Sequence, residues 1–334
     1  MTRVSVIILN YNGTQFTIDC LKAIEKQTFR DFEVILIDNG STDDSLGLLR
    51  AYLNTHSTGI PLEFKHIDKN LGFSGGNNAG LEYAKGVYIA LLNNDAEPDS
   101  RWLQGLVNAM DGNPAVGICA SKILVHGSSV IDSAGDGFVR SLKGYKRGEG
   151  EGAENFSGEE FVFGACAGAA LYRREMIGEI GFLDEEFFLI HEDSDLNFRA
   201  QLTGWKVLYV PGAIVYHKVR SSIGRWSDLE VYYTLRNSYL VKVKNTPLGL
   251  AVFCLPEILA ATITEFIYFV LRHGKGILYF RAIGGALLLL PSMLRKRNAN
   301  LSRKKATNKY LWNMMMPIFG KGILRAKLKK LFYD

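Results

Sequence analysis

The chain has 334 residues, of which 47% are hydrophobic and 22% charged, so it can form one large α/β domain with an appendage or two modest domains. This composition excludes a wholly disordered chain. The net charge is +5, yet residues 295–334 hold 12 Lys and Arg against one acid, Asp334, and the body before them is acidic. An acidic body does not suit nucleic acid, whereas the basic tail suits an anionic membrane.

Strands and helices alternate over the first hundred residues. A helix is expected over Thr17–Lys26 and another from the turn after Asp38 to about Leu53. Such alternation favours a mostly parallel sheet with helices on both faces. The four expected strands are Val4–Leu9, Phe32–Ile37, Leu62–Ile67 and Val87–Leu92.

A polar cluster follows three of these strands. In a parallel sheet, ligands bind beyond the carboxyl ends of the strands. We therefore expect the three clusters to lie together on one edge of the sheet. They are Asn10–Asn12, Asp38–Ser41 and Asn93–Asp95.

The middle of the chain is less regular. Residues 128–160 are rich in Gly, Ser and charged side chains, which predicts a loop-rich excursion. Trp205–Val210 and Ala213–Tyr216 are expected as two strands around a Pro-Gly pair, and residues 228–245 as a helix. The change of character after this helix divides the chain into a catalytic domain, residues 1–246, and a helical region, residues 247–334.

Two apolar segments, Leu248–Leu271 and Ile277–Leu294, are each about long enough to cross a bilayer. Glu257, Glu265 and Arg281 interrupt them, and a carboxylate in mid-bilayer costs on the order of 3 kcal/mol. Three alternatives remain: helices that lie in the membrane interface or form a dimer, a spanning hairpin, and an ordinary buried pair. A hairpin would leave body and basic tail on the cytosolic side.

The cysteines and the first residues bear on the compartment. The cysteines are widely spaced without a C-x-x-C pair, which suggests neither a zinc knuckle nor a redox motif and fits a reducing compartment. Val4–Leu9 is too short for a signal-peptide core, so we expect a cytosolic catalytic part. The cysteines are Cys20, Cys119, Cys166 and Cys254.

Acidic side chains supply the candidate chemistry. Asp95 ends a strand, where one carboxylate with phosphate oxygens and water could bind Mg²⁺ or Mn²⁺; a simple turn residue is the alternative. Glu192 and Asp193 could include a general base or could merely favour the first turn of a helix. His217 follows a strand and is either a structural hydrogen-bonding group or a neighbour of the metal.

The segment Asn70–Gly80 is rich in Gly and Asn, and by itself is a weak signal. It lacks the spacing of a dinucleotide motif and the Lys of a phosphate-binding loop. It does allow close approach of a ligand to the backbone at a helix start.

In this order, the segments over residues 3–245 resemble the family 2 glycosyltransferases, and most closely a rhamnosyltransferase-like or galactofuranosyltransferase-like branch. The resemblance implies a GT-A fold and a set of donor-binding residues. Asn93-Asn94-Asp95 stands where that family has Asp-x-Asp, and Tyr232-Tyr233 with Arg236-Asn237 also looks like this branch. The implied substrate-binding residues are Asn10, Tyr11, Asn12, Asp38, Asn39, Asn70, Gly72, Phe73, Gly75, Gly76, Asn77, Asn78, Asn93 and Asn94.

The resemblance also implies roles. Asp95 and His217 would hold Mg²⁺ or Mn²⁺, and Asp193, beside Glu192, would be the catalytic base of an inverting transfer. The donor would be dTDP-rhamnose or a UDP-sugar, and the acceptor a lipid-linked or cell-surface glycan precursor. The expected location is the cytoplasmic face of the membrane, with the C-terminal helices as an anchor or homo-oligomer contact.

One departure and two rivals limit this interpretation. Processive synthases carry Gln-x-x-Arg-Trp, but here Ser222 precedes Arg225-Trp226 at the Gln position, which favours addition of one or a few sugars. A sugar nucleotidyltransferase would need an early Gly-rich loop with a Lys or Arg, and residues 10–15 supply none. A non-catalytic scaffold that binds nucleotide sugars would not need Asp38, Asp95 and Asp193 together.

Overall fold

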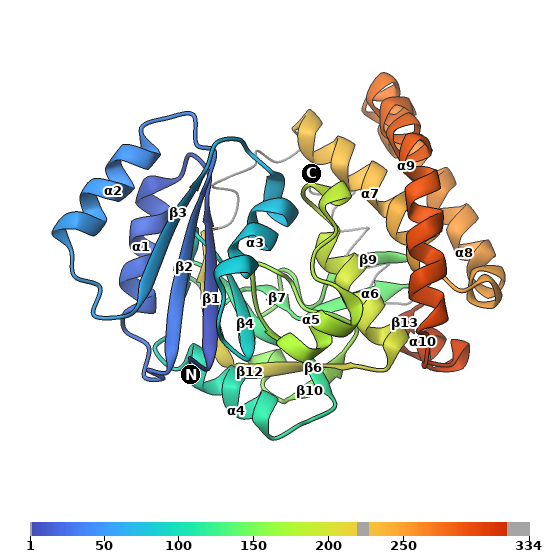
Figure 1. Cartoon of the computed structure of the whole chain (residues 1–334). Helices are drawn as coiled ribbons and strands as arrows, with labels where there is room; N and C mark the ends of the chain where they lie inside the picture. The colour runs from blue at the N-terminus through green and yellow to red at the C-terminus, as the bar shows by residue number, and fades with distance from the viewer. Residues whose placement is uncertain (1, 219–226, 319–334) are drawn as a thin grey trace.

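A twisted sheet of ten strands organises the molecule, and the computed structural model describes residues 2–218 and 227–318 (Figure 1). Its strand order is β10-β12-β6-β11-β4-β1-β2-β3, with β5 paired to β12 and β7 paired to β6. The strands are β1 Val4–Asn10, β2 Phe32–Asn39, β3 Leu62–Ile67, β4 Tyr88–Asn93, β5 Ala96–Pro98, β6 Val116–Val125, β7 Ile131–Ala134, β10 Glu160–Val162, β11 Ala169–Arg173 and β12 Lys206–His217.

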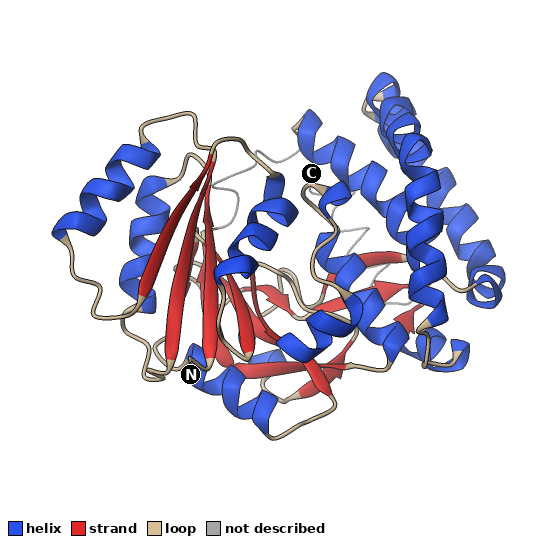
Figure 2. Cartoon of the chain, viewed as in Figure 1, coloured by secondary structure: helices blue, strands red, loops and turns tan. Residues whose placement is uncertain are grey.

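Helices cover both faces of this sheet (Figure 2). Alternate residues of β1 point to opposite faces: Val6 and Ile8 pack in the cluster that contains α1, whereas Ile7 packs in the cluster that contains α5 and α6. The helices are α1 Thr14–Ile24, α2 Ser45–Thr55, α3 Gly72–Tyr83, α4 Trp102–Asp111, α5 Arg174–Ile180 and α6 Glu192–Thr203, with short 3₁₀ turns η1 Ala153–Phe156 and η2 Glu185–Phe187.

The sheet is mixed but mostly parallel, as the sequence predicts. β1 pairs in parallel with β2 and β4, and β11 is antiparallel to β4 and β6. The register sets Asn10 opposite Asp38 and Leu9 opposite Asn93. The polar clusters that follow β1, β2 and β4 therefore lie on one edge, called the strand-end rim below.

Two expectations about the middle of the chain are wrong. Residues 128–160 are not mainly loop: they contain β7, β8 (Asp136–Val139) and β9 (Lys143–Lys146), and the latter two form a small second sheet with β13 (Met315–Met316). Residues 206–217 form one strand instead of two, because a register shift between Val210 and Ile214 absorbs the Pro-Gly pair while pairing with β6 continues.

Three long helices lie together on the side of the molecule away from α2 (Figure 1). They are α7 Asp228–Asn245, α8 Leu248–Phe266, which continues as the π-helical turn η3 Ile267–Arg272, and α9 Gly276–Ser302; α10 Asn308–Met314 follows. α8 begins after Pro247, close to the expected division at residue 246, although that division into domains stays a prediction.

The hairpin of α8 and α9 exposes much apolar surface. By length and composition both helices could cross a membrane, and only 17% of each apolar window is buried, which speaks against an ordinary buried pair. Lys143 Nζ contacts Glu265 Oε1 at 2.9 Å, and Lys296 Nζ contacts Asp184 Oδ1 at 2.6 Å, so ion pairs tie the hairpin to the body. Ser221, Ser222, Arg225, Trp226 and the end of the basic tail lie outside the described residues.

Candidate active site

Asp38 ends β2 and centres a hydrogen-bond network on the strand-end rim. Its Oδ1 accepts hydrogen bonds from Asn10 Nδ2 at 2.8 Å and from the Ser41 hydroxyl at 2.5 Å. Its Oδ2 lies 2.8 Å from His66 Nδ1. The Asp38 carboxylate is fully buried beneath these partners. The network holds the turns after β1 and β2 together.

A second series of hydrogen bonds joins Asn10 to the third polar cluster. The Thr17 hydroxyl donates to Asn10 Oδ1 at 2.8 Å, and Asn94 Nδ2 donates to the Thr17 hydroxyl at 3.1 Å. Asn94 directly precedes Asp95, so the polar turns after β1, β2 and β4 form one connected surface. Tyr11, at the end of β1, is 42% exposed and offers an aromatic face for stacking.

Two asparagines shape the turns around this surface. Asn12 has a positive φ of 51°, and its Oδ1 accepts the Thr42 backbone N–H at 2.8 Å. Asn39 Nδ2 donates to Asn70 Oδ1 at 3.1 Å and to the Gly72 carbonyl at 3.0 Å. Asn39 thus fastens the start of α3 to the rim.

The Gly- and Asn-rich segment forms helix α3, and packing explains several of its residues. A Cβ at Gly76 would lie 2.5 Å from Leu9 Cδ1, so this glycine lets α3 approach β1. Asn78 Nδ2 donates to the Leu183 carbonyl at 2.8 Å. A Cβ at Gly75 would lie 2.7 Å from Leu71 Cβ. Asn77 Nδ2 donates to the Phe73 carbonyl, and the Asn93 N–H donates to the Gly168 carbonyl. These contacts position α3 against β1 and the strand-end rim.

Asp95 and His217 face each other beside the rim. Asp95 Oδ1 lies 3.3 Å from His217 Nε2, and His217 Nδ1 lies 3.0 Å from Asp132 Oδ2. Lys146 Nζ donates to both Asp132 oxygens at 2.8 and 2.9 Å. Burial acts to lower the pKa of His217, but hydrogen bonds with Asp132 and Asp95 outweigh it and raise that pKa to about 9. Surroundings that favour a proton also favour a divalent cation.

The donor set fits a nucleotide-bound Mg²⁺ or Mn²⁺. Within residues 2–218 and 227–318, no group of three or more His, Cys, Asp or Glu side chains could hold an ion. Ions that bind with a diphosphate need only one or two protein ligands, because phosphate oxygens and water complete the shell. A carboxylate on the far nitrogen of a ligating histidine is the usual support, and Asp132 occupies that place.

Asp193 and Glu192 begin α6, and their carboxyl groups lie among other acids. The Ser194 N–H donates to Asp193 Oδ1 at 2.6 Å. Burial raises the pKa of Asp193, and hydrogen bonds from the backbone of Ser194 and Ala167 oppose this rise. Burial and the neighbouring Asp193 charge raise the pKa of both Glu192 and Asp136 well above the ordinary range. A raised pKa makes a carboxylate a stronger base.

The loop before Glu192 has strained backbone held by α7. Phe188, Ile190 and His191 all have positive φ, between 65° and 70°, which non-glycine residues seldom adopt. Asn237 Nδ2 lies 2.6 to 2.9 Å from the carbonyls of three residues of this loop, Phe187, Leu189 and Ile190. Residues 187–191 are called the clamped loop below.

The clamped loop also touches the start of α3. The Ser74 N–H donates to the Phe188 carbonyl at 3.1 Å, and a Cβ at Gly72 would lie 2.4 Å from the same oxygen. The Phe188 ring stacks on Tyr233 with centroids 5.4 Å apart, and Arg236 lies 4.6 Å from the Tyr233 ring centroid. The start of α3 is therefore in direct contact with the clamped loop that leads into α6.

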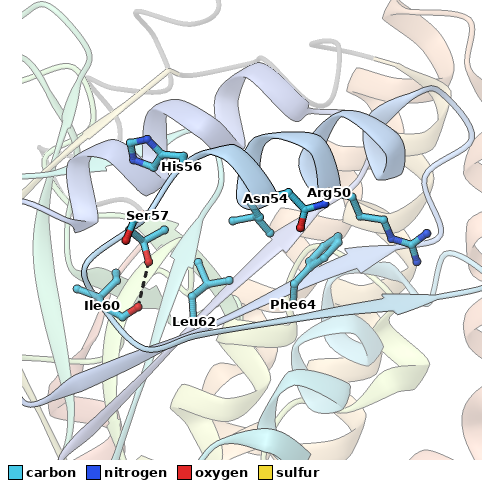
Figure 3. A pocket seen from close by; sticks show the side chains of 9 residues that line it. Arg50, Asn54, His56, Ser57, Ile60, Leu62 and Phe64 are labelled. Atoms are coloured by element: carbon cyan, nitrogen blue, oxygen red, sulfur yellow. Dashed lines mark hydrogen bonds between the residues drawn. The ribbon is translucent and has the colours of Figure 1, made fainter.

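A pocket of about 490 Å³ lies elsewhere, between α2 and the amino end of β3 (Figure 3). Arg50, His56, Leu62 and Phe64 are among its lining residues. It is shallow and lies away from the carboxyl ends of the strands, where an α/β sheet binds its ligands. We do not assign the reaction to it.

Sequence reasoning missed His66, Asp132, Asp136 and Lys146. His66 lies near the end of β3, where the strand-end rule applied to the third strand would have found it. Asp132, Asp136 and Lys146 lie in the segment expected to be loop, and no spacing signal marks them. Only the pairing of β7 with β6 brings Asp132 to His217.

Comparisons with known proteins show which family the chain resembles. The family model described as "Glycosyl transferase family 2" matches residues 5–181. The amylovoran biosynthesis glycosyltransferase AmsB of Erwinia amylovora is 24% identical over 265 residues, which cover 73% of this chain and 83% of the relative.

Two solved structures show the fold. A Pyrobaculum calidifontis mannosyltransferase in complex with GDP-Man and Mn²⁺ has a TM-score of 0.55 and 16% identity, over 99% of this chain and 88% of that one. The S. aureus TarS fragment in complex with UDP-GlcNAc has a TM-score of 0.58 and 18% identity, over 90% and 89%. The α/β fold is thus the GT-A fold, and the chain belongs to glycosyl transferase family 2, whose members transfer a sugar from a nucleotide sugar.

Proposed function

We propose that the protein is an inverting, metal-dependent hexosyltransferase that acts at the cytoplasmic face of a membrane. Its donor is dTDP-rhamnose or a UDP-sugar, and its acceptor is a hydroxyl of a lipid-linked or cell-surface glycan precursor. The observation that carries this proposal is the pairing of two sites: Asp95 beside His217 on one side, and Asp193 with its raised pKa at the start of α6 on the other. Structural relatives crystallised with GDP-Man and Mn²⁺ or with UDP-GlcNAc support it.

On the donor side, the chain's residues bind and orient the nucleotide diphosphate. Tyr11 supplies an exposed ring for the base, while Asp38 keeps the turns after β1 and β2 in register through Asn10. Asp95 and His217 would hold the divalent ion, which when bound neutralises the charge that develops on the leaving diphosphate. Asp132 fixes the His217 ring so that Nε2 points to Asp95.

On the acceptor side, Asp193 takes the proton from the attacking hydroxyl. The oxygen then attacks the anomeric carbon from the face opposite the diphosphate, the bond to the diphosphate breaks, and the configuration inverts. Burial and the charge of Asp193 raise the pKa of Glu192 and Asp136 well above the ordinary range, which favours their protonated forms beside an ionised Asp193. The clamped loop holds this group of acids in place.

The exposed apolar hairpin supports a place at the membrane. Its most exposed side chains are 60% to 83% accessible, which is costly in water and favourable in lipid. Because Glu265 is tied to Lys143 of the body, we favour a hairpin that lies in the interface over one that crosses the bilayer. These side chains are Leu248, Val252, Phe253, Ile263, Leu271, Ile277, Leu287 and Leu288.

The first experiment is a panel of nucleotide sugars incubated with purified protein and Mn²⁺. A donor that binds raises the unfolding temperature, and its hydrolysis or transfer should release a nucleoside diphosphate. Release of pyrophosphate from a sugar phosphate and a nucleoside triphosphate would instead indicate a nucleotidyltransferase. Binding without any metal-dependent turnover would indicate a scaffold.

A further inference from the structure

Lys242 of α7 is a partly buried lysine that no carboxylate of the described residues contacts directly. Its ammonium forms no ion pair or hydrogen bond there, and it lies 4.9 Å from the centroid of the Tyr239 ring. Removing an ammonium from water costs several kcal/mol unless an anion or acceptors compensate. This position therefore needs an explanation that the contacts within the chain do not provide.

The neighbours of Lys242 are mostly basic or neutral. Burial lowers the pKa of Lys242, the charge of Glu265 opposes this, and the charge of Lys143 adds to it, so the three groups lie near one another. Lys143 is already paired with Glu265 at 2.9 Å. One carboxylate thus faces two ammonium groups, and a positive charge is left over.

His191 of the clamped loop adds a second unsatisfied group. Its Nδ1 lies 3.2 Å from the Ser194 hydroxyl, while its Nε2 is buried and has no hydrogen-bond partner among the described residues. Burial, with the charges of Lys143 and Lys242, lowers its pKa to about 3, so the imidazole is neutral. A neutral imidazole can donate one N–H to an oxygen anion.

The position of this cluster suggests which anion it serves. His191 is two residues before the base Asp193, and Gly144 of β9 packs against Ser194, so Lys143 lies beside the same helix start. On the other side, Glu265 belongs to α8, where Ile263 and Ile267 are 60% and 49% exposed. The cluster lies between the catalytic base and the apolar surface.

We propose that Lys143, Lys242 and His191 form a binding site for a phosphate or diphosphate group that joins the acceptor sugar to a lipid. This inference rests on the proposed function and names its acceptor class. The sugar hydroxyl would reach Asp193, the phosphate would contact the cluster, and the hydrocarbon would lie on the exposed side of α8. Phosphate oxygens supply the several acceptors that two ammonium groups and an imidazole can share.

The test measures binding of farnesyl diphosphate to the full chain by calorimetry, with EDTA present so that the Asp95–His217 site holds no divalent ion. We expect Lys242→Met to weaken binding roughly tenfold or more, since a charge-assisted contact is lost, and Lys242→Arg to retain it. Farnesol and inorganic pyrophosphate separate the contribution of the hydrocarbon chain to the affinity from that of the diphosphate group. Farnesol should bind weakly in every variant, and pyrophosphate should lose affinity in Lys242→Met as farnesyl diphosphate does.

Controls separate this site from a structural lysine. Arg281→Met removes an exposed cation of α9 outside the cluster and should leave farnesyl diphosphate binding unchanged. If Lys242 only supports the fold through Glu265, Lys242→Met will lower the unfolding temperature and bind farnesyl diphosphate as the wild type does, which overturns the proposal. Wild-type turnover of a nucleotide sugar is read separately, so loss of the proposed function and loss of this site give different results.

Discussion

The donor side and the acceptor side of the candidate site are built differently. On the donor side, the connected groups Asn10, Asp38 and Asn94 are joined by short hydrogen bonds between turns that follow parallel strands. On the acceptor side, buried acids and lysines sit on a helix start, a strained loop and the hairpin, and their pKa values are shifted. The donor side is held in one geometry by hydrogen bonds. On the acceptor side, neighbouring groups keep charged side chains in place despite the desolvation cost of burying them.

This difference suggests that the donor side serves binding of the nucleotide and the acceptor side serves the reaction. A rim of turns joined by hydrogen bonds can hold one nucleotide geometry with little reorganisation. Charges in a low-dielectric setting interact strongly with a developing reaction charge, but each must be held in place by neighbours. Substitutions on the acceptor side should therefore affect rate and stability, whereas those on the donor side should affect affinity.

The sharpest test of this comparison is Asp193→Asn. We expect turnover to fall by about 10²–10⁴-fold, because the general base is lost, while the donor dissociation constant stays nearly unchanged. Transfer rate and donor binding are measured on the same preparation. Because the pKa of Asp193 is raised, the wild-type rate should fall on the acid side at a pH above the ordinary Asp value of 3.8. Full activity of the variant would refute the assignment of the base.

The next largest effect should come from Lys244→Met in the buried ion network. Lys244 Nζ contacts Asp184 at 2.7 Å and Asp195 at 2.8 Å, and the lysine side chain is only 4% exposed. Its loss leaves two buried carboxylates short of a partner and should lower the free energy of unfolding by about 3–5 kcal/mol. Lys305→Met, which removes a surface pair with Glu179, is the matched control and should cost under about 1 kcal/mol.

Asp132→Asn tests whether the histidine support matters to the metal. Loss of the carboxylate on His217 Nδ1 should weaken Mn²⁺ binding by about 10- to 100-fold. Electron paramagnetic resonance of free Mn²⁺, with nucleotide present, measures this without any turnover. Equal affinity in the two proteins would show that Asp132 serves the fold alone.

Asn237→Ala tests whether α7 positions the base through the clamped loop. Three carbonyls lose their shared donor, and we expect turnover to fall about tenfold with a loss of about 1–3 kcal/mol in stability. Hydrogen exchange at residues 188–191 should rise in the same variant. Asn300→Ala, which removes a hydrogen bond to Asn245 outside the loop, is the control. If both variants change turnover equally, the hydrogen bonds from Asn237 to the clamped loop do not position the base.

The smallest effect is the acid sensitivity of the network around Asp184. Burial acts to raise the pKa of Asp184, but Lys244 and Lys296 outweigh it and lower that pKa to about 2. Because the folded pKa lies below the unfolded value, this contribution is complete above about pH 4 and disappears as the pH falls through 2. Denaturant titration over that range should show a loss on the order of 2 kcal/mol, and Lys244→Met should show a smaller one.

The donor side was largely predictable from the sequence, because parallel strands and their end residues follow local patterns. Asn10, Asp38 and Asp95 each follow a β-branched or apolar run, and the register places Asn10 beside Asp38 and Leu9 beside Asn93, two residues before Asp95. The acceptor side was not predictable from the sequence, because its side chains are brought together by packing between segments that are far apart in the chain. Nothing near Lys146 indicates Asp132, and nothing near Asn237 indicates a clamp on residues 187–190. Asp193 and His217 were candidates from the sequence, but only the family pattern chose between their alternative roles.

The Lys143–Glu265 ion pair has a consequence for the distance between the base and the membrane surface. Because it joins β9 to the end of α8, the body and the hairpin would turn and tilt as one piece on a lipid surface. The height of the base above that surface would then be set by the protein and not by a flexible tether. Such an enzyme would act on short glycans near their lipid. It would release a product once the glycan is too long for its end to reach the base.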